Sequence, residues 1–389
     1  MSEYDVSALR KFVAPEFVFG AGAGSLTGQF AANLSIHKAL VVSGPVLENI
    51  GTPGQVIDSL SEAGIRSELF VDVSPNPRDH EVMAGAEIYK ETNCDAIVAV
   101  GGGSPMDCAK AIGIVCTNHQ HVLEFEGVDN VSNPGPPLLC VPTTAGTAAD
   151  ISQFCIINNT QRKVKIAIVS KTMVPDVALI DPLLTMTMGA ELTAYTGLDA
   201  LTHAVEAYVS NASSPITDLN ALEAVWLIHK HLLRAVEEPN NVEARTGMML
   251  ASTYAGLAFS NAILGAVHAM AHSLGGLLDL PHGLCNAILL DHVMDFNLDA
   301  DPERFRKLGN ALGASIPQGA PIDEVREQAL GAVRKLKKAV GVEDNLCELG
   351  MTKDDLLPLA ENALADACML TNPKQPTADE VIGIYEEAC

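Results

Sequence analysis

The chain has 389 residues, of which 48% are hydrophobic and 19% charged, and its formal net charge is -24. This length suits two domains with apolar cores of their own. The acidic balance argues against binding to nucleic acid or to an anionic membrane surface. We expect no signal peptide and no membrane-spanning segment, because Glu3, Asp5, Arg10 and Lys11 stand near the start and no apolar run reaches about 18 residues.

The N-terminal half alternates short apolar runs with helical patterns. Segments 39–43 and 96–100 are continuous apolar runs, as expected of parallel strands that are buried on both faces. Further strands are expected at 67–73, 138–141, 165–169 and 177–180, with helices at 54–63 and 78–91. This alternation predicts an α/β domain with a largely parallel sheet over residues 1–185.

A glycine turn, residues 101–107 (Gly-Gly-Gly-Ser-Pro-Met-Asp), follows the expected strand at 96–100. We expect Ser104 to cap a helix, with Pro105 at its first position and Asp107 completing a capping box. Glycines let a phosphate approach the backbone amides, and the helix dipole favours its charge. The segment therefore predicts an anion site, although such a turn can also be purely structural.

A second polar segment, residues 142–147 (Pro-Thr-Thr-Ala-Gly-Thr), follows the expected strand at 138–141. Hydroxyl groups at the carboxyl end of such a strand face the crevice in which doubly wound sheets bind ligands. On its own, the segment could equally be an ordinary turn with capping threonines.

After Pro182 the strand signals stop and long helical patterns follow, for example at 217–235, 242–261 and 322–340. These patterns predict an all-α second domain over residues 186–389.

This helical half carries a pattern of possible metal ligands. Asp199 and His203 stand four residues apart, so on a helix both side chains lie on one face. His268 and His272 repeat that spacing, and His282 follows in an expected turn. One carboxylate with three imidazoles can hold a divalent transition metal and leave room for an oxygen ligand.

Simpler interpretations remain for parts of this pattern. Asp199 and His203 alone would more often form a plain hydrogen bond, and His272 could be a core histidine. A zinc peptidase is a poor alternative, because Ala269 stands where the general-base glutamate of the H-E-x-x-H motif would be. The nine cysteines are scattered, and we expect all of them to be reduced thiols in a cytoplasmic protein.

Several separated motifs together resemble the iron-containing (group III) alcohol dehydrogenase family, over nearly the whole chain. The resemblance implies a dinucleotide-binding α/β domain followed by a helical domain, in a dehydroquinate synthase-like architecture with the active site in the cleft between them. It also implies a homodimer or a larger homo-oligomer. The motifs that carry it are residues 17–22, 101–104, 142–147, 197–207, 265–275, 281–283 and 371–373.

By this resemblance, the metal ligands are Asp199, His203, His268 and His282. The fifth residue of the pattern, His272, would be a non-ligand histidine that helps to relay the alcohol proton. The family favours Fe²⁺, while the same donor set also suits Zn²⁺, Mn²⁺, Co²⁺ or Ni²⁺.

The resemblance also assigns a nucleotide site. The glycines and the serine of the turn at 101–107 would hold the pyrophosphate. Three threonines and one lysine would line the nucleotide cleft. Phe259 and Cys368 match positions near the substrate. The residues of the nucleotide site are Gly102, Gly103 and Ser104 for the pyrophosphate, and Thr143, Thr144, Thr147 and Lys165 for the cleft.

Two positions depart from the family pattern. Gly44 stands where many members have an aspartate that binds the adenosine ribose and repels a 2′-phosphate, so either NAD or NADP is expected. Residues 146–150 read Gly-Thr-Ala-Ala-Asp in place of the common Gly-Thr-Gly-Ser-Glu, which is a mild change.

The expected function is that of a metal-dependent alcohol dehydrogenase or aldehyde reductase, which transfers a hydride between a small alcohol and NAD(P). Its expected partners are a small-molecule alcohol or aldehyde, with neither nucleic acid nor membrane. The alternatives are a glycerol dehydrogenase-like or dehydroquinate synthase-like enzyme on the same fold, and a non-catalytic scaffold with a vestigial site.

Overall fold

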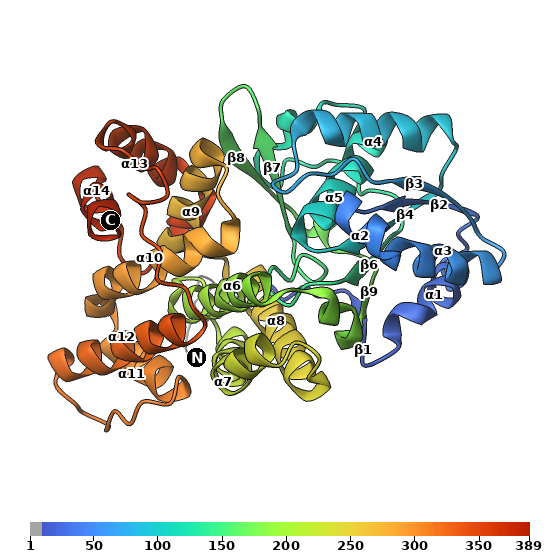
Figure 1. Ribbon diagram of the computed structural model, residues 1–389. Helices are drawn as coiled ribbons and strands as arrows, with labels where there is room; N and C mark the ends of the chain where they lie inside the picture. The colour runs from blue at the N-terminus through green and yellow to red at the C-terminus, as the bar shows by residue number, and fades with distance from the viewer. Residues whose placement is uncertain (1–9) are drawn as a thin grey trace, which may run out of the picture.

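The computed structural model describes residues 10–389. Glu3 and Asp5, on which the argument against a signal peptide partly depends, lie outside the described residues. Figure 1 shows a sheet-containing part built from the first half of the chain beside a helical part built from the second half. The last strand ends at Ile180 and the first long helix after it begins at Ala190. The domain boundary at residues 185 and 186 stays a prediction.

The main sheet has six strands, and all their pairings are parallel. This confirms the expected α/β class with a largely parallel sheet. Its inner strands are almost continuously apolar because both faces of the sheet are covered. In spatial order the strands are β1 (Glu16–Phe19), β9 (Val177–Ile180), β6 (Leu138–Pro142), β4 (Ala96–Gly101), β2 (Lys38–Val42) and β3 (Arg66–Phe70).

Alternating side chains of these strands enter two different cores. Leu40 and Ile97 belong to the core on one face, and Val41 and Val98 to the core on the other. α4 and α5 pack on the first face, and α1 and α3 on the second. The helices of this part are α1 (Thr27–Asn33), α2 (Pro45–Ile50), α3 (Thr52–Glu62), α4 (Asp79–Glu91) and α5 (Gly103–Asn118).

A second, three-stranded sheet joins the two parts of the molecule. It is formed by β5 (Gly127–Val128), β8 (Val164–Val169) and β7 (Phe154–Asn159), with β7 antiparallel to β8. β7 packs on α5 and β8 packs on α9, so this sheet lies at the junction seen in Figure 1. The strand patterns in the sequence predict β8 but not β1, β5 or β7.

No strand follows β9 in the part of the chain that the structure describes, as the sequence predicts. One large core joins α6 to α10 with the later helices. α6 is buried along most of its length, which places it at the centre of this part. The helices are α6 (Ala190–Val209), α7 (Pro215–Glu237), α8 (Val242–Ala262), α9 (Ala266–Leu278), α10 (His282–Asn297), α11 (Pro302–Ala311), α12 (Ile322–Ala339), α13 (Leu356–Ala365) and α14 (Ala378–Glu387).

Short 3-10 helices fill several connections between these elements. They are η2 (Ala23–Leu26), η3 (Val122–Phe125), η4 (Lys171–Met173), η5 (Pro182–Thr187), η6 (Leu298–Ala300), η7 (Lys353–Asp355) and η8 (Ala367–Thr371).

The start of α5 differs from the expectation. The helix begins at Gly103, with Gly102 as its N-cap and no side-chain capping hydrogen bond. The prediction of Ser104 as the cap, Pro105 at the first position and Asp107 in a capping box is therefore wrong. The glycines allow the chain to enter the helix directly from β4, so no polar side chain is needed to start it.

The cysteine expectation is wrong for one pair. Cys347 and Cys389 form a disulfide across 42 residues, because α14 brings the last residue beside the connection that follows α12. The other seven cysteines are free and buried, and all of them lie within residues 10–389.

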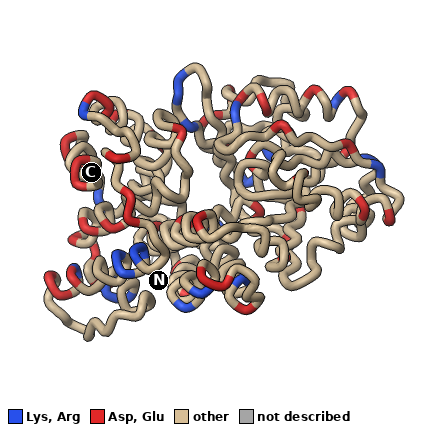
Figure 2. The backbone as a smooth tube through the Cα atoms, viewed as in Figure 1, with Lys and Arg blue, Asp and Glu red and all other residues tan. Residues whose placement is uncertain are grey.

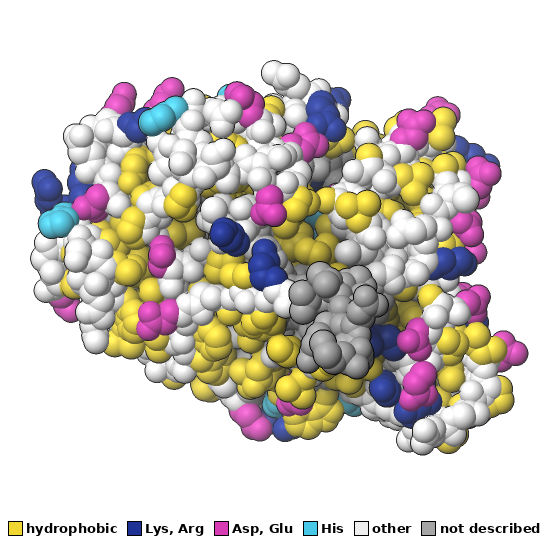
Figure 3. All heavy atoms as spheres, turned by 180° about the vertical axis from the view of Figure 1, so that it is seen from behind, with side chains coloured by type: hydrophobic (Ala, Val, Ile, Leu, Met, Phe, Trp, Pro, Cys, Tyr) yellow, Lys and Arg dark blue, Asp and Glu magenta, His cyan; other side chains and the backbone are white. Residues whose placement is uncertain are grey.

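Charged side chains are dispersed over the molecule. Figure 2 shows acidic positions along both parts of the chain, interspersed with fewer basic ones. The face seen in Figure 3 carries no continuous basic patch. Within residues 10–389 no single helix is long and apolar enough to cross a membrane, while one pair, α8 and α9, meets the length and composition criteria only with a 100° bend between its helices.

Candidate active site

Three of the predicted metal ligands converge in the helical part. Asp199 comes from the middle of α6, His268 from the first turn of α9, and His282 is the first residue of α10 rather than part of a turn. Asp199 Oδ1 lies 3.9 Å from His268 Nε2 and 3.8 Å from His282 Nε2. One ligand atom from each residue fits within 4.8 Å of the others. A carboxylate and two imidazoles at this spacing are a donor set that suits a divalent transition metal.

His203, the fourth predicted ligand, lies next to this group, although its ring nitrogens are not within 4.8 Å of all three other ligand atoms. It stands one turn after Asp199 on α6, and its Nδ1 is 4.0 Å from Asp199 Oδ2. Its ring stacks on His268 and on Phe259, with ring centroids 4.5 Å and 4.3 Å away. Nδ1 of His203 and Nδ1 of His282 are buried without a hydrogen-bond partner. Such unpartnered buried nitrogens fit a site that binds an electrophile.

Burial keeps these imidazoles neutral. It lowers the pKa of His203 to about 4 and that of His268 to about 3, and it holds the pKa of His282 well below its usual range. The charged forms are disfavoured because desolvation of an imidazolium is costly. At neutral pH the rings therefore offer lone pairs, as metal ligation requires.

Glu206 fixes the orientation of His268, and the sequence analysis missed it. One carboxylate oxygen lies 2.5 Å from His268 Nδ1, and the other accepts a 2.7 Å hydrogen bond from the Val267 amide. Burial raises the pKa of Glu206 to about 7. A proton on Nδ1 leaves Nε2 free to face Asp199. Its spacing could have revealed it, because Glu206 follows Asp199 by two helical turns on the same face of α6.

His272 lies next to this group and has a carboxylate partner of its own. Its Nδ1 is 2.9 Å from Asp366 Oδ2, and its ring stacks on His282 with centroids 5.3 Å apart. The Asp366 carboxylate also accepts a 2.8 Å hydrogen bond from the Cys368 amide. His272, Asp366 and Cys368 thus form a second polar group, which adjoins the first where His272 stacks on His282.

Asn372 ties the end of the chain to the start of α9. Its Oδ1 accepts hydrogen bonds of 3.0 Å from the Ala266 amide and from Asn297 Nδ2. It belongs to the Thr-Asn-Pro segment at residues 371–373, which therefore supports the helix that carries His268 and His272.

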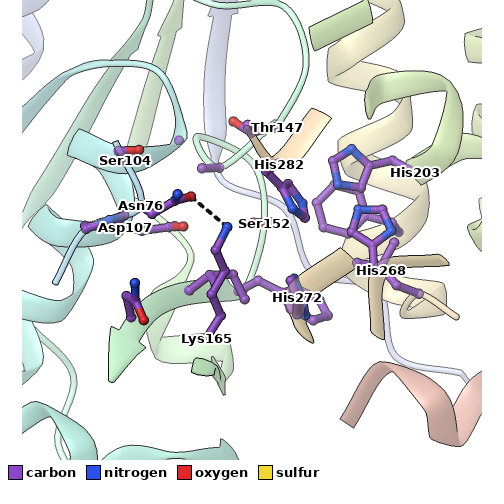
Figure 4. Close-up of a pocket in the computed structure, with 18 residues that line it drawn as sticks. Asn76, Ser104, Asp107, Thr147, Ser152, Lys165, His203, His268, His272 and His282 are labelled. Carbon is purple, nitrogen blue, oxygen red and sulfur yellow. Dashed lines mark hydrogen bonds between the residues drawn. The ribbon is translucent and has the colours of Figure 1, made fainter. Parts of the chain in front are cut away.

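The histidines face the sheet-containing part across one cavity. In Figure 4, His203 and His268 lie on one side, Ser104 and Asp107 lie on the other, and Lys165 and His272 lie between.

Lys165 Nζ donates a 2.7 Å hydrogen bond to Asn76 Oδ1, and burial lowers the pKa of Lys165. Burial also raises the pKa of Asp107 to about 6.

The lining of this cavity combines polar and apolar residues. It consists of Asn76, Pro77, Gly103, Ser104, Asp107, Thr147, Ala149, Ser152, Phe154, Ile156, Asn158, Lys165, His203, Phe259, Leu264, His268, His272 and His282.

The glycine turn packs tightly against the threonine segment. A Cβ on Gly102 would lie 3.0 Å from Thr144 Cγ2, and one on Gly103 would lie 3.0 Å from Thr147 Cγ2. The Thr143 amide donates a 2.9 Å hydrogen bond to the Gly101 carbonyl. The two segments predicted to bind the nucleotide are therefore neighbours at the carboxyl ends of β4 and β6.

Not every predicted nucleotide residue reaches the cavity. Gly103, Ser104, Thr147 and Lys165 line it, whereas Gly102, Thr143 and Thr144 lie beside its wall. Gly44 is the N-cap of α2, directly after β2, and it is also outside the lining.

Comparisons with known proteins identify the family of this chain. A family model described as iron-containing alcohol dehydrogenase matches residues 14–182, and a model of the C-terminal part of the same family matches residues 193–389. The chain is 43% identical to the 1,3-propanediol dehydrogenase of Klebsiella pneumoniae over 372 residues, covering 95% of this chain and 96% of that protein. It is 42% identical to alcohol dehydrogenase 4 of Saccharomyces cerevisiae over 378 residues, covering 97% of each.

Solved structures of similar fold also belong to alcohol oxidoreductases. A crystal structure of 1,3-propanediol oxidoreductase superposes with a TM-score of 0.94 at 42% identity, covering 98% of this chain and 100% of that one. An alcohol dehydrogenase from Oenococcus oeni also superposes with a TM-score of 0.94, at 38% identity and with coverage of 98% and 100%. This chain therefore belongs to the iron-containing alcohol dehydrogenase family and is an alcohol or aldehyde oxidoreductase.

Proposed function

We propose that this enzyme transfers a hydride between a small alcohol and NAD(P), with a divalent metal held by Asp199, His203, His268 and His282. The observation that carries the proposal is the cavity in which buried neutral imidazoles face the glycine turn. A bound divalent ion supplies Lewis acidity toward the substrate oxygen. The family's description favours Fe²⁺ over Zn²⁺ as that ion.

The residues of the sheet-containing part would hold the nucleotide. Backbone amides at Gly103 and Ser104, at the N-terminus of α5, offer a site for the pyrophosphate. Thr147 and Lys165 add a hydroxyl and a cation near the centre of the cavity. Their role is to bring the nicotinamide within hydride reach of the substrate carbon.

His272 would carry the alcohol proton. With Asp366 accepting from Nδ1, its Nε2 is the nitrogen free to accept a proton. When NAD(P) is bound, its ribose hydroxyls and water would complete this relay.

The substrate would be a short alcohol or its aldehyde. Phe154, Ile156, Phe259 and Leu264 supply an apolar wall beside the histidines, which excludes water from the reacting atoms. Relatives named 1,3-propanediol dehydrogenase and, in Escherichia coli, lactaldehyde reductase at 36% identity support this substrate class. The NAD-dependent methanol dehydrogenase of Bacillus methanolicus, at 37% identity, supports NAD as one cofactor. By the family resemblance we also propose a cytoplasmic homo-oligomer.

The test is a panel of short alcohols assayed at 340 nm, with NAD and NADP in parallel and one defined metal at a time. We expect reduction of the nucleotide with at least one alcohol, loss of activity with a chelator, and recovery with Fe²⁺ or Zn²⁺. His203→Ala, His268→Ala and His282→Ala should lose metal together with activity. His229→Ala, which changes an exposed histidine on α7, is the matched control.

Two outcomes would contradict the proposal. Full activity of rigorously metal-free protein would remove the metal from the mechanism. A dehydroquinate synthase-like reaction would consume its substrate without net formation of NADH.

A further inference from the structure

Asn286 lies at the point where the three converging ligand atoms meet. It stands four residues after His282 on α10, so both side chains lie on one face of that helix. Its side-chain Nδ2 is 2.7 Å from Asp199 Oδ1, 3.1 Å from His268 Nε2 and 3.2 Å from His282 Nε2. Its side chain is fully buried.

The hydrogen bonds of this carboxamide are unbalanced. The amino group has two hydrogens and three acceptors within 3.2 Å. The carbonyl oxygen of the same group, Oδ1, is buried and has no hydrogen-bond partner. A buried carbonyl without a hydrogen-bond partner destabilises the folded state, so this oxygen requires an explanation.

A metal ion and the amino group of Asn286 compete for the same lone pairs. The N–H groups point toward Asp199 and the two imidazoles, and a cation bound by those atoms would repel them. Rotation of the carboxamide about its last bond exchanges nitrogen for oxygen without moving α10. Carboxamide oxygens are ordinary ligands of hard divalent ions.

Asn286 approaches the ligand atoms from the interior of the protein. His203, His268 and His282 line the cavity, whereas Asp199 and Asn286 do not. An oxygen of Asn286 would thus add to the ligand set on the side away from the cavity, and the position that a substrate oxygen needs would stay open.

We propose that Asn286 is a fifth protein residue of the metal centre. Its carbonyl oxygen faces the bound ion, and its amino group holds Asp199, His268 and His282 together when the ion has been removed. The inference rests on the proposed metal-dependent function and adds a residue to its ligand set.

The test compares wild type with Asn286→Asp and Asn286→Leu, using Co²⁺ as the probe metal. Asparagine and aspartate both offer an oxygen, whereas leucine has nearly the same volume and offers none. Asn220→Leu is the control, because Asn220 on α7 donates only to the carbonyl of Ile216. Affinity for Co²⁺ is measured by competition with a coloured chelator, and the coordination number is read from the visible absorption of the cobalt protein.

We expect Asn286→Leu to bind Co²⁺ about tenfold more weakly or worse, and to show the stronger absorption of a centre with one ligand fewer. Asn286→Asp should keep the wild-type spectrum and an affinity at least equal to that of wild type. In chelator-treated protein both variants should melt below wild type, since neither can donate hydrogen bonds to the three ligand atoms. The Asp variant, which keeps the shape of the side chain, remains informative if the Leu variant fails to fold.

Identical cobalt spectra for wild type and Asn286→Leu would overturn the proposal. So would weaker Co²⁺ binding by Asn286→Asp than by wild type, which indicates that Asn286 acts only as a hydrogen-bond donor to Asp199. If wild type itself binds no Co²⁺, Zn²⁺ or Fe²⁺, the proposed metal-dependent function fails together with this inference.

Discussion

Glu206 and His268 lie on different helices, α6 and α9, yet the carboxylate oxygen is 2.5 Å from the imidazole Nδ1. Because the second oxygen of Glu206 is held by the Val267 amide, the carboxylate cannot easily turn away. The pair sets the tautomer of His268 and the direction in which its Nε2 points.

Replacing Glu206 should therefore weaken metal binding without removing a ligand. Glu206→Gln should lower metal affinity by about tenfold to a hundredfold, because the amide is a poorer acceptor for the Nδ1 proton. Competition with a chelator measures this change. Glu191→Gln, at an exposed position on the same helix, should bind metal as wild type does. Unchanged affinity in Glu206→Gln would mean that His268 is oriented by packing alone.

The glycine turn gives a prediction about the nucleotide. Gly102→Val would press against Thr144 and crowd the backbone that is expected to meet the pyrophosphate. Loss of one amide–phosphate hydrogen bond costs about 1.5–3 kcal/mol, so nucleotide affinity should fall at least roughly tenfold. Metal content should stay normal. Titration calorimetry with NAD and NADP tests this, with Gly54→Ala, which has open space around it, as the control. Wild-type affinity in Gly102→Val would exclude this turn from the phosphate site.

Cofactor choice depends on Gly44. Its backbone has a φ of -113° and a ψ of 158°, and a Cβ there would meet only the Val73 carbonyl at 3.5 Å, so aspartate fits. Gly44→Asp should favour NAD over NADP, because the carboxylate accepts ribose hydroxyls and repels a 2′-phosphate. A like-charge contact of about 1–3 kcal/mol corresponds to a roughly tenfold to hundredfold change in the ratio of kcat/KM values. An unchanged ratio would place the adenosine ribose elsewhere.

Asp291 offers a prediction about stability. This buried carboxylate on α10 accepts hydrogen bonds of 2.6 Å from Lys337 and 2.7 Å from Arg334, both on α12. Asp291→Asn should lower the free energy of unfolding at pH 7 by about 2–4 kcal/mol, because two cations lose their partner. The half-exposed Arg334 contributes less than Lys337, since solvent screens it. Urea titration measures the change, and Glu327→Gln, at an exposed position on α12, is the control.

The contacts of Asp291 with Lys337 and Arg334 also predict that the free energy of unfolding depends on pH. Burial alone would raise the pKa of Asp291, but Lys337 and Arg334 outweigh it, and the pKa lies below the ordinary value of 3.8. A depressed pKa contributes stability that is fully present above the unfolded value and is lost as pH falls through the folded one. The difference between wild type and Asp291→Asn should thus be constant from pH 7 to about 5 and shrink below about pH 4. A difference that is as large at pH 2 as at pH 7 would mean that the contact is not ionic.

The sequence predicts the fold well wherever burial leaves a periodic pattern. Continuous apolar runs reveal β2 and β4 because both faces of the main sheet are covered. β7 was not predicted because it lies in a small separate sheet, where its partner strand is β8, and because it ends in Asn158 and Asn159. The Cys347–Cys389 bridge has no signal in the spacing, since it depends on where α14 returns.

In the candidate site, contacts between residues one helical turn apart can be predicted from the sequence, whereas contacts between distant segments cannot. Spacing by one helical turn points to Asp199 with His203, and the same rule would have found Asn286 from His282. Asp366 could not be derived from local spacing, because its contact with His272 joins residues 94 apart in the sequence. The packing of α13 and η8 against α9 brings them together.

These long separations determine when the site can exist during folding. Asn286 and Asp199 are 87 residues apart, and the contact between Asn372 and the start of α9 spans 106 residues. Closing such loops is slow compared with forming a single helix. During synthesis, His268 and His272 on α9 therefore leave the ribosome well before Asn372, whose hydrogen bond stabilises the start of that helix. We therefore expect the proposed metal centre to take up its ion late, when the chain is already folded.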